Sequence, residues 1–347
     1  MAQSGRRIEL IDFLRGGAMI LVLLHHSGFP FGKWILAFHM PLFFILSGYT
    51  EAVKSNRSQQ QFAKFLLKKV KRLIVPYFLF EIINLLIWYI RCLVLGKTIR
   101  VVSPLISILL CINTDAYNGL CGRLWFLPCM FVSSIFFYLC KRYISNHQGL
   151  ICVTGICFFV SWITFKLIPG RLPFTIDTAF MATAFLLVGY WGKTIIGYLL
   201  DNGHIVIDVA ICLLMLGMLY STYRTNRAGM LMYINEYGDY IYSILGSIGG
   251  SIAYLLIAKY LYYFMKRVSL LNNFVLWYSY NSLATFPVHL QIKCVLLLFG
   301  LSWTGIWWAL FLVMLFGNII IVNIITNYLP FLLGQGYTKN VSKKLFL

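Results

Sequence analysis

The sequence predicts an all-α, polytopic integral membrane protein with about ten transmembrane helices and both termini in the cytoplasm. Three observations predict this class. The 347 residues are 60% hydrophobic, 11% are charged, and the mean hydropathy is +0.81. A soluble domain carries about 25% charged residues, so a water-soluble protein is excluded. The apolar residues also gather in long runs, with lysines and arginines concentrated between alternate runs.

The apolar runs define the expected spans. A helix needs about 20 mostly apolar residues to cross a bilayer. Ten runs approach that length: 10–27, 34–53, 73–95, 124–140, 150–168, 174–191, 205–222, 240–264, 274–299 and 304–327. The first run lacks a cleavage site of small residues and is expected to be a retained helix. No Gly/Ser-rich linker or internal repeat divides the chain, so we expect a single membrane domain over residues 1–347.

The distribution of positive charge sets the expected orientation. With a cytoplasmic N-terminus, the cytoplasmic stretches carry 17 of the 29 lysines and arginines, and the opposite stretches carry 8. Cytoplasmic loops of membrane proteins hold the excess of Lys and Arg, so ten spans with both termini inside fit the count. Residues 101–112 are too short to span and contain Pro104. They are expected at the outer surface or in a re-entrant segment.

Arg15 and His26 are ionisable residues within the first span. Charged groups at a helix centre cost roughly 2.5 to 3.5 kcal/mol on insertion scales, so they usually mark a function. Eleven residues separate the pair, which places both on nearly one helix face with a rise of about 16 Å. The same geometry turns His25 about 100° away, toward a packing or interface role. Arg15 could also simply pair with Asp12, one turn away.

A basic stretch, FAKFLLKKVKRLIVPY, precedes the third span. One interpretation is anchoring to anionic lipid, at roughly 1 kcal/mol per basic residue near the surface. The other is a phosphate-binding patch for an anionic cytoplasmic donor. For that second interpretation the candidate donor-binding residues are Arg15, Lys68, Lys69, Lys71 and Arg72.

Three histidines fall at one expected depth, near the outer ends of their spans. His26 lies about 24 Å along the first span, and His289 about 22 Å along the ninth. His39 follows the outer start of the second span. Imidazole titrates near neutrality and serves as a general base, so these are the candidate catalytic residues. A structural hydrogen-bonding role or a proton relay is the alternative for each of them.

Polar residues near the same layer are candidates for substrate binding. Arg123 and Trp125 stand at the outer start of the fourth span. Glu81 lies about 12 Å into the third span and could instead pair with Arg15. The nine cysteines are scattered without a CxxC pair, so no metal site is expected.

Six motifs, in order, resemble the membrane-bound acyltransferase family 3, and in particular its stand-alone polysaccharide O-acetyltransferases. They are IELIDFLRGGAMILVLLHH, FHMPLFFILSGY, KKVKRLIVPYFLF, GRLWFLPCMF, DTAFMATAFLLVGYWGK and YNSLATFPVHL. The resemblance implies a ten-helix enzyme that moves an acyl group, usually acetyl, from cytoplasmic acyl-CoA to a sugar hydroxyl. It maps the family's helix-one arginine and histidine onto Arg15 and His26, for donor binding and acyl transfer respectively. The family often has two arginines three apart where this chain has Lys69 and Arg72.

The expected reaction is therefore O-acetylation of a cell-surface or lipid-linked glycan, with acetyl-CoA as co-substrate and no metal. His26 would act as general base, with His39 or His289 orienting it or donating to the oxyanion. A covalent acyl-His26 intermediate stays open. The expected location is the inner or plasma membrane, with lipids, acyl-CoA and the glycan as partners and no nucleic acid. The alternative from another class is a transporter or flippase for a lipid-linked sugar, which would need no acyl donor.

Overall fold

The computed structural model describes residues 2–54, 61–99, 102–112, 124–201, 203–226, 229–298 and 305–334. In this part the chain is helical, and its only β pairing is an isolated bridge between Leu231 and Glu236. The α-helices are α1 (Ala2–His26), α2 (Gly32–Val53), α3 (Phe62–Lys69), α4 (Val75–Val94), α5 (Val102–Leu109), α6 (Phe126–Tyr143), α7 (His147–Leu167), α8 (Ile176–Trp191), α9 (Lys193–Asp201), α10 (Ile205–Thr225), α11 (Tyr240–Met265), α12 (Ser269–Tyr280), α13 (Ser282–Leu298) and α14 (Trp307–Tyr328). The predicted all-α class is confirmed for these residues.

Seven helical segments of the described chain are long and apolar enough to cross a membrane. They are Gly32–Val53, Phe62–Val94, His147–Leu167, Pro173–Trp191, Ile205–Thr225, Tyr240–Met265 and Trp307–Tyr328. Helix α1 has 25 residues but carries Glu9, Asp12 and Arg15. Helix α6 has 18 residues and ends on Lys141 and Arg142. The protein is thus a multi-pass membrane protein, while the total of ten spans and the orientation of the termini stay predictions.

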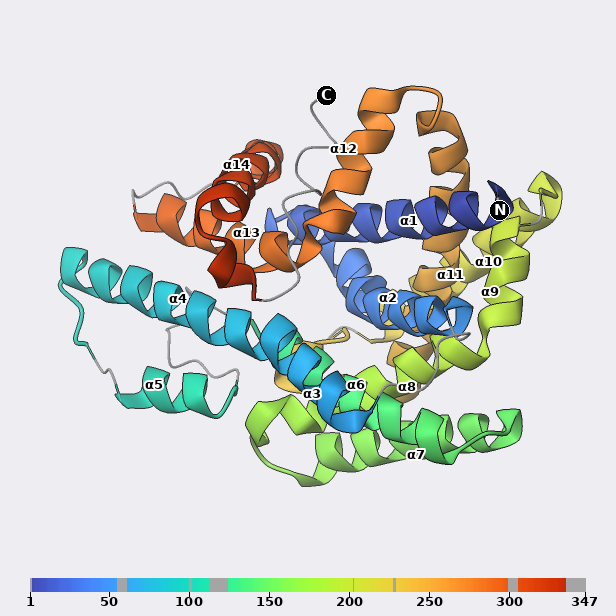
Figure 1. Ribbon diagram of the computed structural model, residues 1–347, viewed down its shortest axis with the longest axis horizontal. Coiled ribbons are helices and arrows are strands. Elements are labelled where there is room, and N and C mark those ends of the chain that lie inside the picture. The colour runs from blue at the N-terminus through green and yellow to red at the C-terminus, as the bar shows by residue number, and fades with distance from the viewer. Residues whose placement is uncertain are drawn as a thin grey trace.

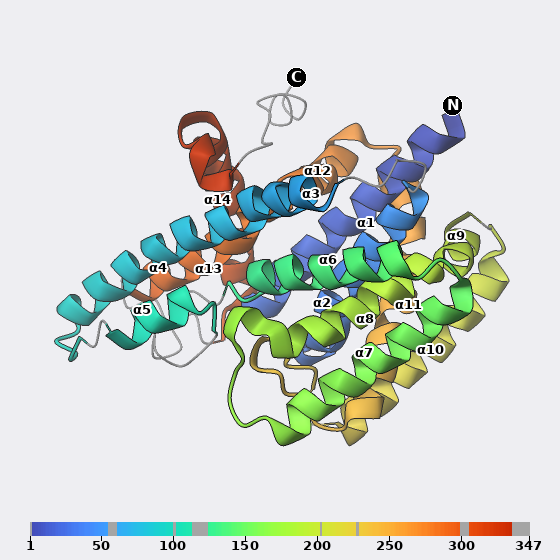
Figure 2. The same cartoon turned by 60° about the horizontal axis from the view of Figure 1, so that its bottom comes forward.

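Helices α1, α2 and α8 form the centre of the molecule. Helix α2 is mostly buried and packs against α8, α11 and α1, while α12 lies along α1. Figures 1 and 2 show α4 and α5 extending to the left of this centre and α10 lying at the right. The outward faces of α7 and α10 are rich in exposed apolar side chains such as Ile156, Phe159, Leu213 and Leu214. Such faces suit contact with lipid rather than water.

The basic stretch does not end before the third span, because the helix is continuous from Phe62 to Val94. A π-helical turn, Val70–Ile74, joins α3 to α4 without a break. Pro76, which has no N–H to donate to the preceding turn, comes just after this π-helical turn. The segment therefore projects from the bundle as one rod, with its lysines at one end and its apolar part at the other.

The expected span over 274–299 is not one continuous helix, because two helices, α12 and α13, meet there at Asn281. The Asn281 amide group, Nδ2, donates to the carbonyl of Trp277 at 2.9 Å, and its own carbonyl accepts from the N–H groups of Ala284 and Thr285. Asn281 thus closes one helix and opens the next. As a result α12 packs on α1, while α13 packs on α14 and carries His289.

Close packing of α2 on α8 depends on two glycines. A Cβ atom on Gly48 would lie 1.9 Å from the carbonyl oxygen of Leu186, and one on Gly189 would lie 1.9 Å from that of Ile45. Small residues allow helix backbones in a membrane to approach this closely. The crossing fixes α2, and α2 carries His39 and Thr50.

Replacing Gly48 with alanine should therefore destabilise the protein, by about 1 to 3 kcal/mol, because the added methyl group overpacks the crossing. The measurement is the thermal unfolding of purified protein in detergent. The matched control is Gly155→Ala, on α7, where an added Cβ meets nothing within 4 Å. A Gly48→Ala protein as stable as Gly155→Ala would contradict this account of the crossing.

Candidate functional site

Four histidines gather at the end of α1. The rings of His26 and His289 are 4.9 Å apart between centroids, those of His25 and His39 5.3 Å, and those of His25 and His26 5.0 Å. They come from three helices: α1, α2 and α13. The structure therefore brings together the three histidines that the sequence placed at one depth. We call His25, His26, His39 and His289 the histidine cluster.

His25, expected in packing or at an interface, lies between α1 and α2 against the rings of His26 and His39. After His26 the chain reverses through Ser27 and Gly28, which has a φ of 88°. This turn brings the carbonyl of Gly32 to within 3.0 Å of the His25 Nδ1 atom. Helix α2 thus reaches round to the His25 side of α1.

Hydrogen bonds to backbone carbonyls fix the tautomers of three rings. Besides the bond of His25, the Nδ1 atom of His39 lies 2.8 Å from the Ile35 carbonyl oxygen, and that of His289 lies 3.1 Å from the Thr285 oxygen. A carbonyl oxygen only accepts, so each Nδ1 carries the hydrogen, and in the neutral ring Nε2 holds a free lone pair. The Nε2 atom of His289 is buried and has no hydrogen-bond partner. A neutral ring with a free Nε2 lone pair can accept a proton there, so these histidines can act as general bases.

A lysine that the sequence reasoning missed lies beside the cluster. The Nζ atom of Lys293 donates to the carbonyl oxygen of His26 at 2.9 Å. Lys293 follows His289 by one helical turn, so both face α1. That i, i+4 spacing within the ninth expected span was the signal available in the sequence.

Arg15 lies near the middle of α1, eleven residues before His26. Its Nη2 atom donates to the Thr50 hydroxyl at 2.9 Å, and the guanidinium interacts electrostatically with Asp12, Arg72 and Glu51. The electrostatic interaction with Asp12 is consistent with the Arg15–Asp12 pairing that the sequence left open. Arg15 is therefore held between α2 and the basic stretch, with two acidic groups near it.

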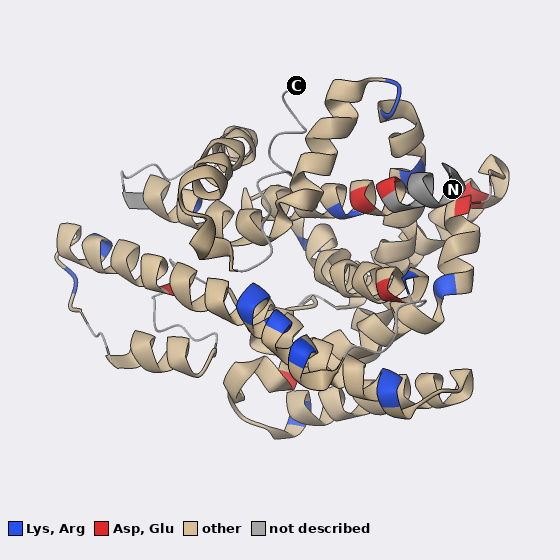
Figure 3. Ribbon diagram, in the orientation of Figure 1, with Lys and Arg blue, Asp and Glu red and all other residues tan. Residues whose placement is uncertain are grey.

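The basic stretch lies close to Arg15, because Arg72 and Glu51 interact with both Arg15 and Lys69. The Nζ atom of Lys69 donates to the Ser134 hydroxyl on α6 at 3.0 Å and interacts electrostatically with Glu51 and Arg72. Lys68 and Arg72 are exposed, and Lys71 is half-buried. Figure 3 shows the positive residues as successive bands along α3 and the π-helical turn that follows it. Arg15 and the candidate donor-binding residues of this stretch thus form one positive region beside Glu51.

The hydrogen bonds of Glu81 are made near the start of α6 and within α4, and not with Arg15. Glu81 is buried, and its carboxylate accepts from the Asn84 amide at 3.3 Å and from the Leu124 N–H at 3.4 Å. Asn84 in turn accepts from Gln291 of α13 at 3.2 Å. Trp125 is also buried, next to Leu124 at the start of α6. These contacts join α4, α6 and α13. Arg123, the third candidate for substrate binding, lies outside the described residues.

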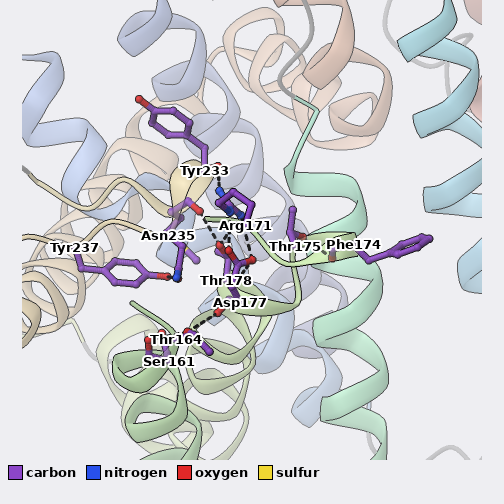
Figure 4. Close-up of polar contacts among 11 residues, drawn as sticks. Ser161, Thr164, Arg171, Phe174, Thr175, Asp177, Thr178, Tyr233, Asn235 and Tyr237 are labelled. Atoms are coloured by element: carbon purple, nitrogen blue, oxygen red, sulfur yellow. Dashed lines mark hydrogen bonds and ion pairs between the residues drawn. The ribbon is translucent and has the colours of Figure 1, made fainter. Parts of the chain in front are cut away.

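A second buried polar group lies in the loops before α8 and α11, and the sequence reasoning did not find it. Arg171 forms two bonds to Asp177, at 2.6 Å from Nε and 3.2 Å from Nη2, and it also donates to Thr178 at 3.1 Å and to the carbonyl of Tyr233. Figure 4 shows Arg171 between Asp177 and the Tyr233 loop. We call Arg171 and Asp177 the loop ion pair. Finding it required the fold, because Tyr233 is 62 residues away.

The loop ion pair lies toward the same end of the bundle as the histidines. The loop it holds contains Met230, whose sulfur accepts from Ser247, and Ser247 also donates to the Ala37 carbonyl, two residues before His39. No group of three or more His, Cys, Asp or Glu in the described chain is arranged to bind a metal ion.

The fold and site together define a multi-pass membrane protein with a histidine cluster at the end of a central helix and a positive region around Arg15, near the middle of that helix. Residues 8–327 match the model of acyltransferase family 3, an acyltransferase domain, and the chain belongs to that family. It is therefore a membrane acyltransferase. No curated protein and no solved structure matched the chain.

Proposed function

We propose that the protein transfers an acetyl group from cytoplasmic acetyl-CoA to a hydroxyl of a cell-surface or lipid-linked glycan, in the inner or plasma membrane. One observation carries the proposal: Arg15 and His26 lie on nearly one face of α1, about 16 Å apart along the axis. The first belongs to the positive region and the second to the histidine cluster. An extended pantetheine arm has a comparable length.

The donor-binding part of the proposal rests on charge. The phosphates of CoA dock on Lys68, Lys69, Lys71 and Arg72, and Arg15 adds a guanidinium at the base of the arm. Lysine at position 69 supplies a point charge rather than the bidentate fork of arginine. Ser134 holds that lysine in place.

The transfer chemistry rests on the free lone pairs of the cluster. His26 is the general base, since no hydrogen bond from a described residue occupies its ring and it is less buried than His39 or His289. It takes the proton of the acceptor hydroxyl as the oxygen attacks the thioester carbon. The unpaired Nε2 of His289, on the neighbouring ring, stabilises the resulting imidazolium. The glycan acceptor is proposed to approach past Trp125, Arg123 and Glu81.

The test has two arms. Membranes with and without the protein are given acetyl-CoA and assayed for release of the CoA thiol, and the surface glycans of the same cells are compared by mass spectrometry. We expect protein-dependent thiol release and a gain of one acetyl unit on a sugar. Glycans of unchanged mass, but of changed abundance at the surface, would instead indicate a transporter and overturn the proposal.

A further inference from the structure

The histidine cluster has many hydrogen-bond acceptors and few donors. Three of its four rings commit the Nδ1 hydrogen to a backbone carbonyl: His25 to Gly32, His39 to Ile35 and His289 to Thr285. Each neutral ring then presents only a lone pair at Nε2. Attack on a thioester builds negative charge on the carbonyl oxygen, which needs donors or a positive charge. His39 and His289, as neutral rings, do not supply either.

Lys293 is the cation placed to meet that need. Its ammonium group interacts electrostatically with His25, His26 and His289. An ammonium has three N–H donors, and in the part of the chain that the structure describes one of them is used, on the carbonyl of His26. Lys293 is half-buried, so its charge is less screened by water than at an open surface.

The contact with His26 holds Lys293 at this position. His26 is the last residue of α1, and carbonyl groups at a helix C-terminus lack helical partners and carry partial negative charge. The Lys293 ammonium caps that end. On the opposite side of α13, Gln291 donates to Asn84 of α4 at 3.2 Å, a contact that does not involve Lys293. The positive charge is thus in place before any substrate binds.

We propose that Lys293 stabilises the oxyanion of the acyl transfer reaction, an inference that rests on the proposed function above. The acceptor oxygen forms a bond to the thioester carbon, its proton passes to His26, and the carbonyl electron pair moves to the oxygen facing the Lys293 ammonium. When the intermediate collapses, that pair re-forms the carbonyl, the carbon–sulfur bond breaks, and the CoA thiolate takes the proton from His26. Lys293 keeps its protons throughout.

The test compares three variants in membranes with acetyl-CoA: Lys293→Met, Lys293→Arg and Gln291→Met. Lys293→Met keeps the length of the side chain and removes the charge, so kcat should fall about 10²- to 10³-fold, as on loss of one oxyanion donor. The KM for acetyl-CoA should stay near that of the wild type, because the donor phosphates bind around Arg15, about 16 Å from His26 along α1. The kcat of Lys293→Arg should be at least tenfold higher than that of Lys293→Met. Gln291→Met changes a contact of the same helix away from the cluster and should keep kcat within threefold.

Three outcomes would overturn the proposal. One is a Lys293→Met enzyme with kcat within threefold of the wild type. Another is a rise in KM at constant kcat, which would make Lys293 a binding group. The third is an equal loss of kcat in Lys293→Met, Lys293→Arg and Gln291→Met, which would show that α13 packing alone matters. Thermal unfolding of each variant accompanies the kinetics. A wild-type protein without acetyl-CoA-dependent thiol release would overturn the proposed function itself, and this inference with it.

Discussion

Replacing His26 with alanine should lower acetyl transfer by about 10²- to 10⁴-fold, the usual contribution of a positioned general base. The loss should appear in kcat, since the positive region that binds the donor lies around Arg15, about 16 Å away along the same helix. The ring of His26 contacts other imidazoles and receives no hydrogen bond from the described residues, so its removal should leave the unfolding temperature nearly unchanged. The measurement is CoA thiol release in membranes at matched protein levels.

The matched control is His204→Ala. His204 is exposed at the start of α10, away from the cluster, and should be replaceable without loss of activity. A His26→Ala enzyme with activity close to that of His204→Ala would remove His26 from the mechanism. His39 and His289 are less suitable for this comparison, because each also bonds to a backbone carbonyl inside its helix.

Replacing Asp177 with alanine should destabilise the folded protein by about 3 to 5 kcal/mol, because it leaves the buried guanidinium of Arg171 without its counter-charge. The Asp177 side chain is fully buried and that of Arg171 is 9% exposed. Thermal unfolding in detergent measures the effect, together with protease cleavage in the loop that contains Tyr233. That loop should become more susceptible, since Arg171 and Thr178 both donate to its backbone.

Glu236→Ala is the control for this second prediction. It removes an acidic side chain from the same loop, but Glu236 is exposed and contributes to the local bridge through its backbone. Its stability should stay within about 0.5 kcal/mol of the wild type, as for most surface substitutions. Equal stability of the two variants would show that the loop ion pair contributes little to the fold.

Features carried by one helix could be predicted from the sequence. The spacing between Arg15 and His26 follows from helical geometry alone, and the apolar runs gave the positions of most helices. Counting residues from the ends of the expected spans also placed His26, His39 and His289 in one layer, and the structure brings their rings together. These inferences need only the rise and rotation of a helix.

Features that depend on how helices meet could not be predicted in this way. His25 joins the cluster because the turn after α1 brings α2 to that side. At Asn281 both the backbone N–H and the side-chain amide donate to the Trp277 carbonyl, and apolar periodicity does not show that a new helix begins there. Lys293 and Arg171 each bond to a carbonyl far away in the sequence, at His26 and Tyr233. No local pattern encodes these partners.

The π-helical turn Val70–Ile74 is a point at which the chain could change in length during evolution without turning one part against the other. A π-helical turn contains one residue more than the α-helix that would replace it. Deleting a single residue there would convert the turn to regular α-helix, and α3 and α4 would keep nearly the same orientation about the axis of the rod. Lys69 would still face Ser134, to which it now donates at 3.0 Å. The chain could thus lose one residue at this point while the lysines of α3 keep their direction and the helices that carry the histidine cluster keep their packing.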